Sequence, residues 1–122
     1  MEKISYIVPT LNEIQNIDST IDKIESVSNN LKIDYEIVCI DGFSTDGTVE
    51  KIKNNINFDK IKFQNQINLN GPSHAIMQGI NIALGTYILI LDADNPINEN
   101  CLKNLVLARS TNRLVIGSRF LK

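Results

Sequence analysis

Short apolar runs alternate along the chain with longer stretches in which apolar residues recur every three or four positions. A short run of this kind is typical of a buried β-strand, whereas the recurring spacing is typical of one face of an α-helix. The runs predict five strands, over residues 4–8, 36–40, 60–63, 87–91 and 114–116. The recurring spacing predicts four helices, over residues 14–27, from near 46 through 52, over 73–84 and over 100–108.

Residues at the ends of these segments predict where three of the helices begin or end. Asn12 is expected to cap the first helix, and Asp46 the second, because a short side-chain oxygen can accept from the free N–H groups of a first turn. Gly47, beside Asp46, allows a tight turn into that helix. Gly85 is expected to end the third helix as a left-handed residue.

Alternation of strands with helices defines the expected fold class. Strands that are apolar on both faces favour a parallel sheet covered by helices on both sides, with right-handed crossovers. We therefore predict an α/β, Rossmann-like fold with a mostly parallel sheet. A length of 122 residues, of which 43% are hydrophobic, fits a single domain over residues 1–122.

Composition narrows the classes of partner and the compartment. The formal net charge of −2 has no long run of one sign, so no nucleic-acid footprint is expected. The longest apolar run, residues 87–91, is far shorter than a membrane span, and no signal peptide precedes the first strand. Cys39 and Cys101 stand alone rather than in a metal or redox motif, so reduced cysteines in a cytoplasmic protein are expected.

The residues that follow the predicted strands are polar, and they form the candidate site. Ligands of such sheets bind beyond the carboxyl ends of the strands. These positions are residues 9–13, 41–48, 92–95 and 117–119. Three acids, Asp41, Asp92 and Asp94, are therefore expected to converge on one edge.

Asp92 and Asp94 form a D-x-D pair at a strand exit. Two carboxylates at this spacing can reach one hard cation, Mg²⁺ or Mn²⁺, whose other ligands would be water and phosphate oxygens. Such a cation neutralises the charge on a departing diphosphate. The alternative is a solvated acidic turn, but the position after a buried strand and opposite Asp41 favours a metal–diphosphate site.

Three further side chains each have a functional and a structural interpretation. Asp41 could accept the ring N–H of uracil or guanine, or it could organise a turn. Arg119 carries a planar fork suited to phosphate, although an ordinary surface arginine is the alternative. His74, at the start of the third predicted helix, could touch a phosphate but is more simply an exposed residue.

Taken together, several segments resemble the family 2 glycosyltransferases of the GT-A fold. They read YIVPTLNE at 6–13, IDGFSTDGT at 40–48, GPSHA at 71–75 and DAD at 92–94. The later IGSRF at 116–120 is similar to the dolichol-phosphate mannosyltransferase-like members, which pass a sugar to a polyprenyl phosphate. Gly42 and Phe43 depart from the Asp-Gly that the family often has there.

The resemblance implies a role for each matched residue. Pro9, Leu11 and Glu13 would line the nucleoside pocket, and Asp41 would recognise the base. Asp92 and Asp94, with Ala93 between them, would handle ribose, diphosphate and metal. Asp94 and Arg119 would be the catalytic residues, with Arg119 on the acceptor phosphate.

The resemblance also implies the partners: a UDP- or GDP-sugar donor, a lipid-phosphate or glycan acceptor, and peripheral association with the cytoplasmic membrane face. Inverting transfer to a hydroxyl needs a carboxylate base from a segment that the family has after this region, whereas a phosphate acceptor is already anionic. The alternative expectation is a donor-binding fragment without transfer activity. A haloacid dehalogenase-type phosphotransferase is disfavoured because its D-x-D follows the first strand, and a dehydrogenase because no G-x-G-x-x-G follows that strand.

Overall fold

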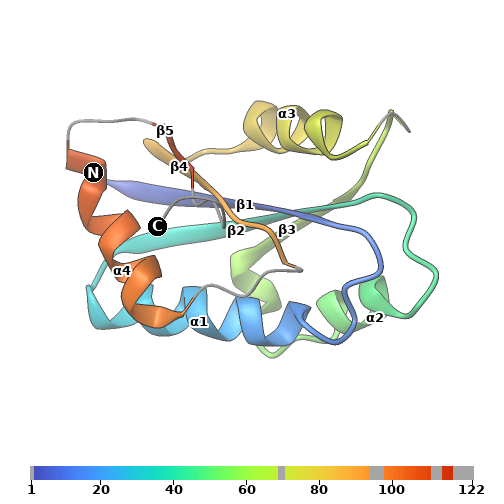
Figure 1. The fold of residues 1–122 in the computed structure, drawn as a ribbon, viewed down its shortest axis with the longest axis horizontal. Helices are drawn as coiled ribbons and strands as arrows, with labels where there is room; N and C mark the ends of the chain where they lie inside the picture. Colours follow the sequence, from blue (N-terminus) through green and yellow to red (C-terminus); the bar gives the residue numbers. More distant parts are fainter. Residues whose placement is uncertain (1, 69–70, 94–97, 111–113, 117–122) are drawn as a thin grey trace.

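Parallel strands form one sheet in the order β3-β2-β1-β4-β5, which places β1 at its centre (Figure 1). The computed structural model describes residues 2–68, 71–93, 98–110 and 114–116. The strands are β1 (Lys3–Thr10), β2 (Asp34–Asp41), β3 (Ile61–Asn65), β4 (Tyr87–Ile90) and β5 (Leu114–Ile116). The helices are α1 (Ile17–Asn30), α2 (Thr48–Lys53), α3 (Pro72–Ile82) and α4 (Glu99–Leu107), with short 3₁₀ turns η1 (Phe58–Lys60) and η2 (Ala108–Ser110). The predicted α/β fold with a parallel sheet is confirmed.

Helices cover both faces of the sheet, which is why its strands are apolar on both sides. Helices α1, α2 and α4 lie on one face and α3 lies on the other (Figure 1). Tyr6 of β1 packs into the larger core with α1 and α4, while its neighbour Ile7 packs into a second core with Ala75 of α3. Alternate residues of one strand thus serve opposite faces, as the pleat of a strand requires.

The two loops that precede α1 and α2 use their polar side chains differently from one another. The N-cap residue of α2 is Gly47, with a φ of 99°, and the helix has no side-chain cap, so the prediction that Asp46 caps it is wrong by one residue. The Oδ1 of Asp46 instead accepts from the backbone N–H of Thr48 at 3.0 Å and so holds the turn that enters the helix. The prediction that Asn12 caps α1 is wrong, since that helix begins at Ile17. The Oδ1 of Asn12 instead accepts from the N–H of Thr45 at 2.8 Å.

Gly85 was predicted to end α3, and this is also wrong. The helix ends at Ile82, and its C-cap residue Ala83 is extended, with φ −67° and ψ 137°. Gly85 instead allows the chain to lie directly against β1. A Cβ at this position would come within 2.7 Å of the backbone oxygen of Lys3 and the backbone nitrogen of Ser5. The glycine is therefore needed for close approach and not for a left-handed turn.

A buried carboxylate joins β1, β2, β3 and the end of α3. Glu36 is 6% exposed, and its Oε2 accepts from the hydroxyl of Ser5 and from the N–H of Leu84, both at 2.6 Å. The ammonium of Lys62 lies 3.3 Å from the other carboxylate oxygen. Burial by itself raises the pKa of Glu36, but these hydrogen bonds and the Lys62 charge outweigh it and hold the pKa below the ordinary value of 4.5.

Glu36→Gln is expected to make the free energy of unfolding less sensitive to pH on the acid side. A carboxyl whose folded pKa is lowered contributes stability above its unfolded pKa and loses it as pH falls through the folded pKa. The parent should therefore lose stability below about pH 4.5 by a step that the variant lacks. Urea unfolding from pH 7 to pH 3 measures this step, with the exposed Asp22→Asn as control. Equal acid sensitivity of parent and Glu36→Gln would contradict the assignment.

Candidate functional site

The site is a cavity at the carboxyl edge of the sheet. Because β1 lies between β2 and β4, the loops that follow these three strands meet at this edge. The cavity measures about 480 Å³, within the range of small-molecule sites. Its walls are formed by Pro9, Thr10, Leu11, Glu13, Gly42, Phe43, Gln66, Gly71, Pro72, Ala75, Asp92 and Ala93.

Five of the residues predicted to bind substrate are brought together in this cavity. Pro9, Leu11 and Glu13 reach it from the end of β1, and Asp92 and Ala93 reach it from the end of β4. Asp92 is exposed, whereas Ala93 is 1% exposed and belongs to the larger core. The buried alanine therefore anchors the backbone next to an accessible carboxylate.

Asp41 has a different setting, because its carboxylate is fully buried and does not line the cavity. Its Oδ1 accepts from the hydroxyls of Thr10 at 2.7 Å and Ser44 at 2.6 Å. Its Oδ2 accepts from the backbone N–H of Ser44 at 2.8 Å. Oδ1 thus joins the loop after β2 to the end of β1, and Oδ2 adds a second bond within that loop. This arrangement favours the turn-organising interpretation of Asp41, and recognition of a base by this residue stays a prediction.

Further hydrogen bonds join the same two loops. The N–H of Asn12 donates to the hydroxyl of Ser44 at 2.8 Å, and the N–H of Glu13 donates to the hydroxyl of Thr48 at 2.8 Å. Asp46 contributes as well, since it accepts from the N–H of Ile14 at 3.2 Å. The side chains of Asp46 and Thr48 therefore both hold these loops together. The cavity wall formed by these loops is consequently fixed before any ligand arrives.

Gln66 is a cavity residue that the sequence analysis did not single out. It follows β3 directly and is 6% exposed. Its side-chain amide donates to the carbonyl of Gly71 at 2.9 Å and also to the carbonyl of Asn68. The rule that ligand residues follow strand ends would have found it if applied to the third strand.

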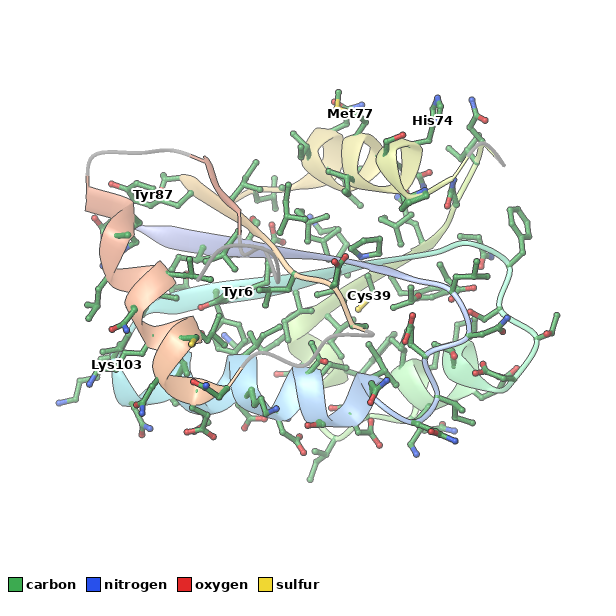
Figure 2. All side chains as sticks on the ribbon, in the orientation of Figure 1. Tyr6, Cys39, His74, Met77, Tyr87 and Lys103 are labelled. Atoms are coloured by element: carbon green, nitrogen blue, oxygen red, sulfur yellow. The ribbon has the colours of Figure 1, made fainter. Side chains whose placement is uncertain are left out.

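Other predicted residues lie elsewhere. Asp94 and Arg119 are outside the described residues. His74 is exposed and is not among the residues of the cavity wall, and Figure 2 shows it pointing away from the sheet on the outer side of α3. The structure thus favours the structural interpretation of His74.

The donor set at the cavity suits a hard cation, although it is incomplete within the described ranges. Among the residues that the structure describes, no group of three His, Cys, Asp or Glu side chains could hold a metal. The exposed carboxylate of Asp92 is nevertheless an oxygen ligand of the kind that Mg²⁺ and Mn²⁺ prefer, and the sequence places Asp94 two residues further on. The chemistry of the residues at this edge therefore fits such an ion.

The cysteines take no part in the site, and both are free. Cys39 of β2 belongs to the larger core and lies among the side chains at the sheet (Figure 2), and burial raises the pKa of its thiol to about 12. Cys101 is exposed on α4. A thiol with so high a pKa is a poor nucleophile at neutral pH, so Cys39 acts as a small core residue.

A parallel sheet in this order, with a partly acidic cavity at the carboxyl ends of its central strands, defines a Rossmann-like α/β domain with its ligand site at the edge where such sheets bind ligands. Residues 5–122 match the model of the family described as glycosyl transferase family 2, and the chain belongs to that family. The predicted family is confirmed.

Known relatives support both the family and the fold. Dolichol-phosphate mannosyltransferase of Pyrococcus furiosus is 31% identical over 121 residues, which cover 98% of this chain and 34% of that protein. The mannosyltransferase PcManGT of Pyrobaculum calidifontis, solved with GDP-Man and Mn²⁺, has a TM-score of 0.74 at 28% identity and covers 90% of this chain and 33% of that one. TarS of S. aureus in complex with UDP has a TM-score of 0.71 at 28% identity, with 86% and 31% covered. The chain thus spans about a third of the length of these relatives.

Within the ranges that the structure describes, none of the helices combines the length and the apolarity needed to cross a bilayer.

Proposed function

We propose that this chain is the donor-binding part of a glycosyltransferase that transfers a sugar, with inversion, from a UDP- or GDP-sugar. The observation that carries the proposal is the cavity at the carboxyl edge, whose wall contains both apolar residues and carboxylates. Pro9, Leu11 and Phe43 supply apolar surface for a nucleoside, and Asp92 supplies a carboxylate for a cation on the diphosphate. The named complexes of PcManGT with GDP-Man and of TarS with UDP support both donor classes.

Asp92 and Asp94 would hold Mg²⁺ or Mn²⁺, with Asp94 the better-placed ligand by its resemblance to the family. A bound divalent ion supplies charge neutralisation for the leaving diphosphate, so no proton donor to that group is needed. The Mn²⁺ in the PcManGT complex supports this choice of ion. The protein's own contribution is a rigid wall formed by the loops after β1 and β2, which orients the nucleotide before transfer.

A polyprenyl phosphate is the acceptor that the resemblance favours, and Arg119 would bind its phosphate. The name of the Pyrococcus furiosus relative, dolichol-phosphate mannosyltransferase, supports this class of acceptor. A phosphate oxygen is already anionic at neutral pH, so it needs positioning rather than deprotonation. Such an acceptor would place the protein at the cytoplasmic face of a membrane, as a peripheral partner.

A second candidate is a chain that binds the nucleotide but does not transfer sugar. The observation that favours it is that the chain spans only about a third of the length of its relatives. Binding and transfer are therefore measured separately. The binding arm tests the cavity, and the transfer arm tests whether the acceptor requirements are met.

Calorimetry with UDP and GDP, each with Mn²⁺ and with EDTA, tests the donor site. We expect one of the two nucleotides to bind with Mn²⁺ at micromolar affinity, and removal of the ion to weaken binding at least ~10-fold. Transfer from the matching radiolabelled UDP- or GDP-sugar to a short polyprenyl phosphate is then assayed. Binding without transfer would select the second candidate. Absence of binding by both nucleotides, with Mn²⁺ and with Mg²⁺, would overturn the proposed function.

A further inference from the structure

Phe43 combines an unusual backbone conformation with an unusual exposure. Its φ is 69°, in the left-handed region that a bulky aromatic residue rarely adopts. The residue is 51% exposed, and it lines the cavity. A strained residue persists only where its surroundings impose the conformation, and such residues cluster at ligand sites.

Hydrogen bonds on both sides of Phe43 impose this conformation. One residue before it, the N–H of Gly42 donates to the carbonyl of Thr10 at 2.8 Å. One residue after it, Ser44 is held by the buried carboxylate of Asp41 through both its N–H and its hydroxyl. The loop therefore cannot relax by rotating Phe43 into an extended conformation without breaking contacts to β1 and β2.

The neighbouring glycine does not relieve the strain, because it serves another purpose. A Cβ on Gly42 would lie 3.1 Å from the side-chain oxygen of Gln66 and 3.5 Å from the carbonyl of Thr10. Gly42 therefore lies tightly against Gln66, and the left-handed position falls on the phenylalanine. The result is an aromatic ring held at the cavity, outside the apolar core.

Leu11 provides a second apolar surface at the same cavity. It is 56% exposed and projects from the loop after β1, which is tied to the Phe43 loop through Asn12. Two half-exposed apolar side chains on fixed loops offer a preformed surface for a flat ring. Burial of that surface by a ligand would be favourable, and an aromatic face stacks on any nucleobase.

We propose that Phe43 is the stacking surface for the base of the bound nucleotide, with Leu11 as its apolar partner, and this rests on the proposed function. Asp41 then acts on the base through the loop, since its own oxygens bind Thr10 and Ser44. Stacking favours no particular base. The choice between uracil and guanine is therefore made by polar groups of the cavity, not by this ring.

Two substitutions separate the ring from the backbone strain. Phe43→Ala removes the ring and keeps a Cβ in the left-handed conformation, whereas Phe43→Gly removes both. We expect each to weaken binding of the preferred nucleotide about 10-fold, which is the order of one lost stacking contact. Phe43→Gly should in addition raise Tm by about 4 °C over Phe43→Ala, because glycine adopts this φ without strain. Phe43→Tyr, which keeps the ring, should retain affinity.

The controls test whether the lost affinity comes from the contact between the ring and the base. Phe58→Ala removes an aromatic side chain that is 39% exposed and lies on η1, away from the cavity wall, and should leave affinity unchanged. Inorganic pyrophosphate with Mn²⁺, which has no base, should bind parent and Phe43→Ala equally. If the parent binds UDP or GDP and Phe43→Ala binds it as well, or if pyrophosphate affinity falls in parallel, the stacking role is overturned while the donor site stands. If the parent binds neither nucleotide, the proposed function fails and the stacking role with it.

Discussion

Asp94→Asn is expected to weaken Mn²⁺-dependent binding of UDP or GDP by about 100-fold, which is the order expected for losing an anionic ligand of a bound divalent ion. The substitution removes one negative charge from the proposed metal site, where a cation would lie between carboxylates and diphosphate. The amide oxygen that remains is a weaker ligand. Calorimetry at fixed nucleotide with increasing Mn²⁺ measures the loss. In EDTA the parent and the variant should bind the nucleotide alike.

Asp92→Asn provides the comparison from within the same pair, and its carboxylate is exposed at the cavity. We expect a smaller loss than for Asp94→Asn, because the resemblance gives Asp92 a share in ribose and diphosphate contacts as well as metal. Asp22→Asn, an exposed acid on α1, is the matched control for the change of charge. If the Asp94→Asn variant bound nucleotide and Mn²⁺ as well as the parent does, the assignment of the metal site to Asp92 and Asp94 would be wrong.

Most of the fold could be predicted from the sequence because the buried strands carry a strong apolar signal. The predicted strand at 114–116 has the bounds of β5, and no end of the other predicted strands differs from the structure by more than two residues. The helix ends were harder to predict. Asn12 carries the side chain of a helix cap, yet it contacts Thr45, more than thirty residues away in the chain. Gly85 is likewise required by its close approach to β1 and not by the end of the helix before it. Both errors arise from tertiary contacts that local patterns do not contain.

The candidate site was predictable where the residues of the cavity wall belong to a segment that follows an apolar run. Pro9, Glu13 and Asp92 were found in this way, and the structure places them in one cavity. The burial of Asp41 was not predictable, because it depends on Thr10 of the neighbouring strand, which pairs with it in register. Phe43 was noticed only as a departure from the family pattern. Its backbone conformation depends on hydrogen bonds made by the residues on either side.

Asp41→Ala is expected to lower the free energy of unfolding by about 3 kcal/mol, because a buried carboxylate with several donors contributes through each of them. The substitution leaves the hydroxyl of Thr10 and the N–H of Ser44 without their acceptor and opens a void at a position with no solvent exposure. The loop after β2 would then lose its attachment to β1. Urea unfolding at pH 7 measures the change as a lower midpoint at an unchanged slope.

Thr10→Val is the graded control, since it keeps the shape of the side chain and removes one of the hydrogen bonds to Asp41, at an expected cost of about 1 kcal/mol. The pair of variants also distinguishes the two interpretations of Asp41. If the carboxylate holds the loop, both variants lose stability, and nucleotide affinity falls in proportion as the wall that carries Phe43 loosens. If Asp41→Ala instead kept the stability of the parent and lost only nucleotide binding, the carboxylate would contact the base itself, and the loop would be held by the remaining bonds between Asn12, Ser44 and Thr45.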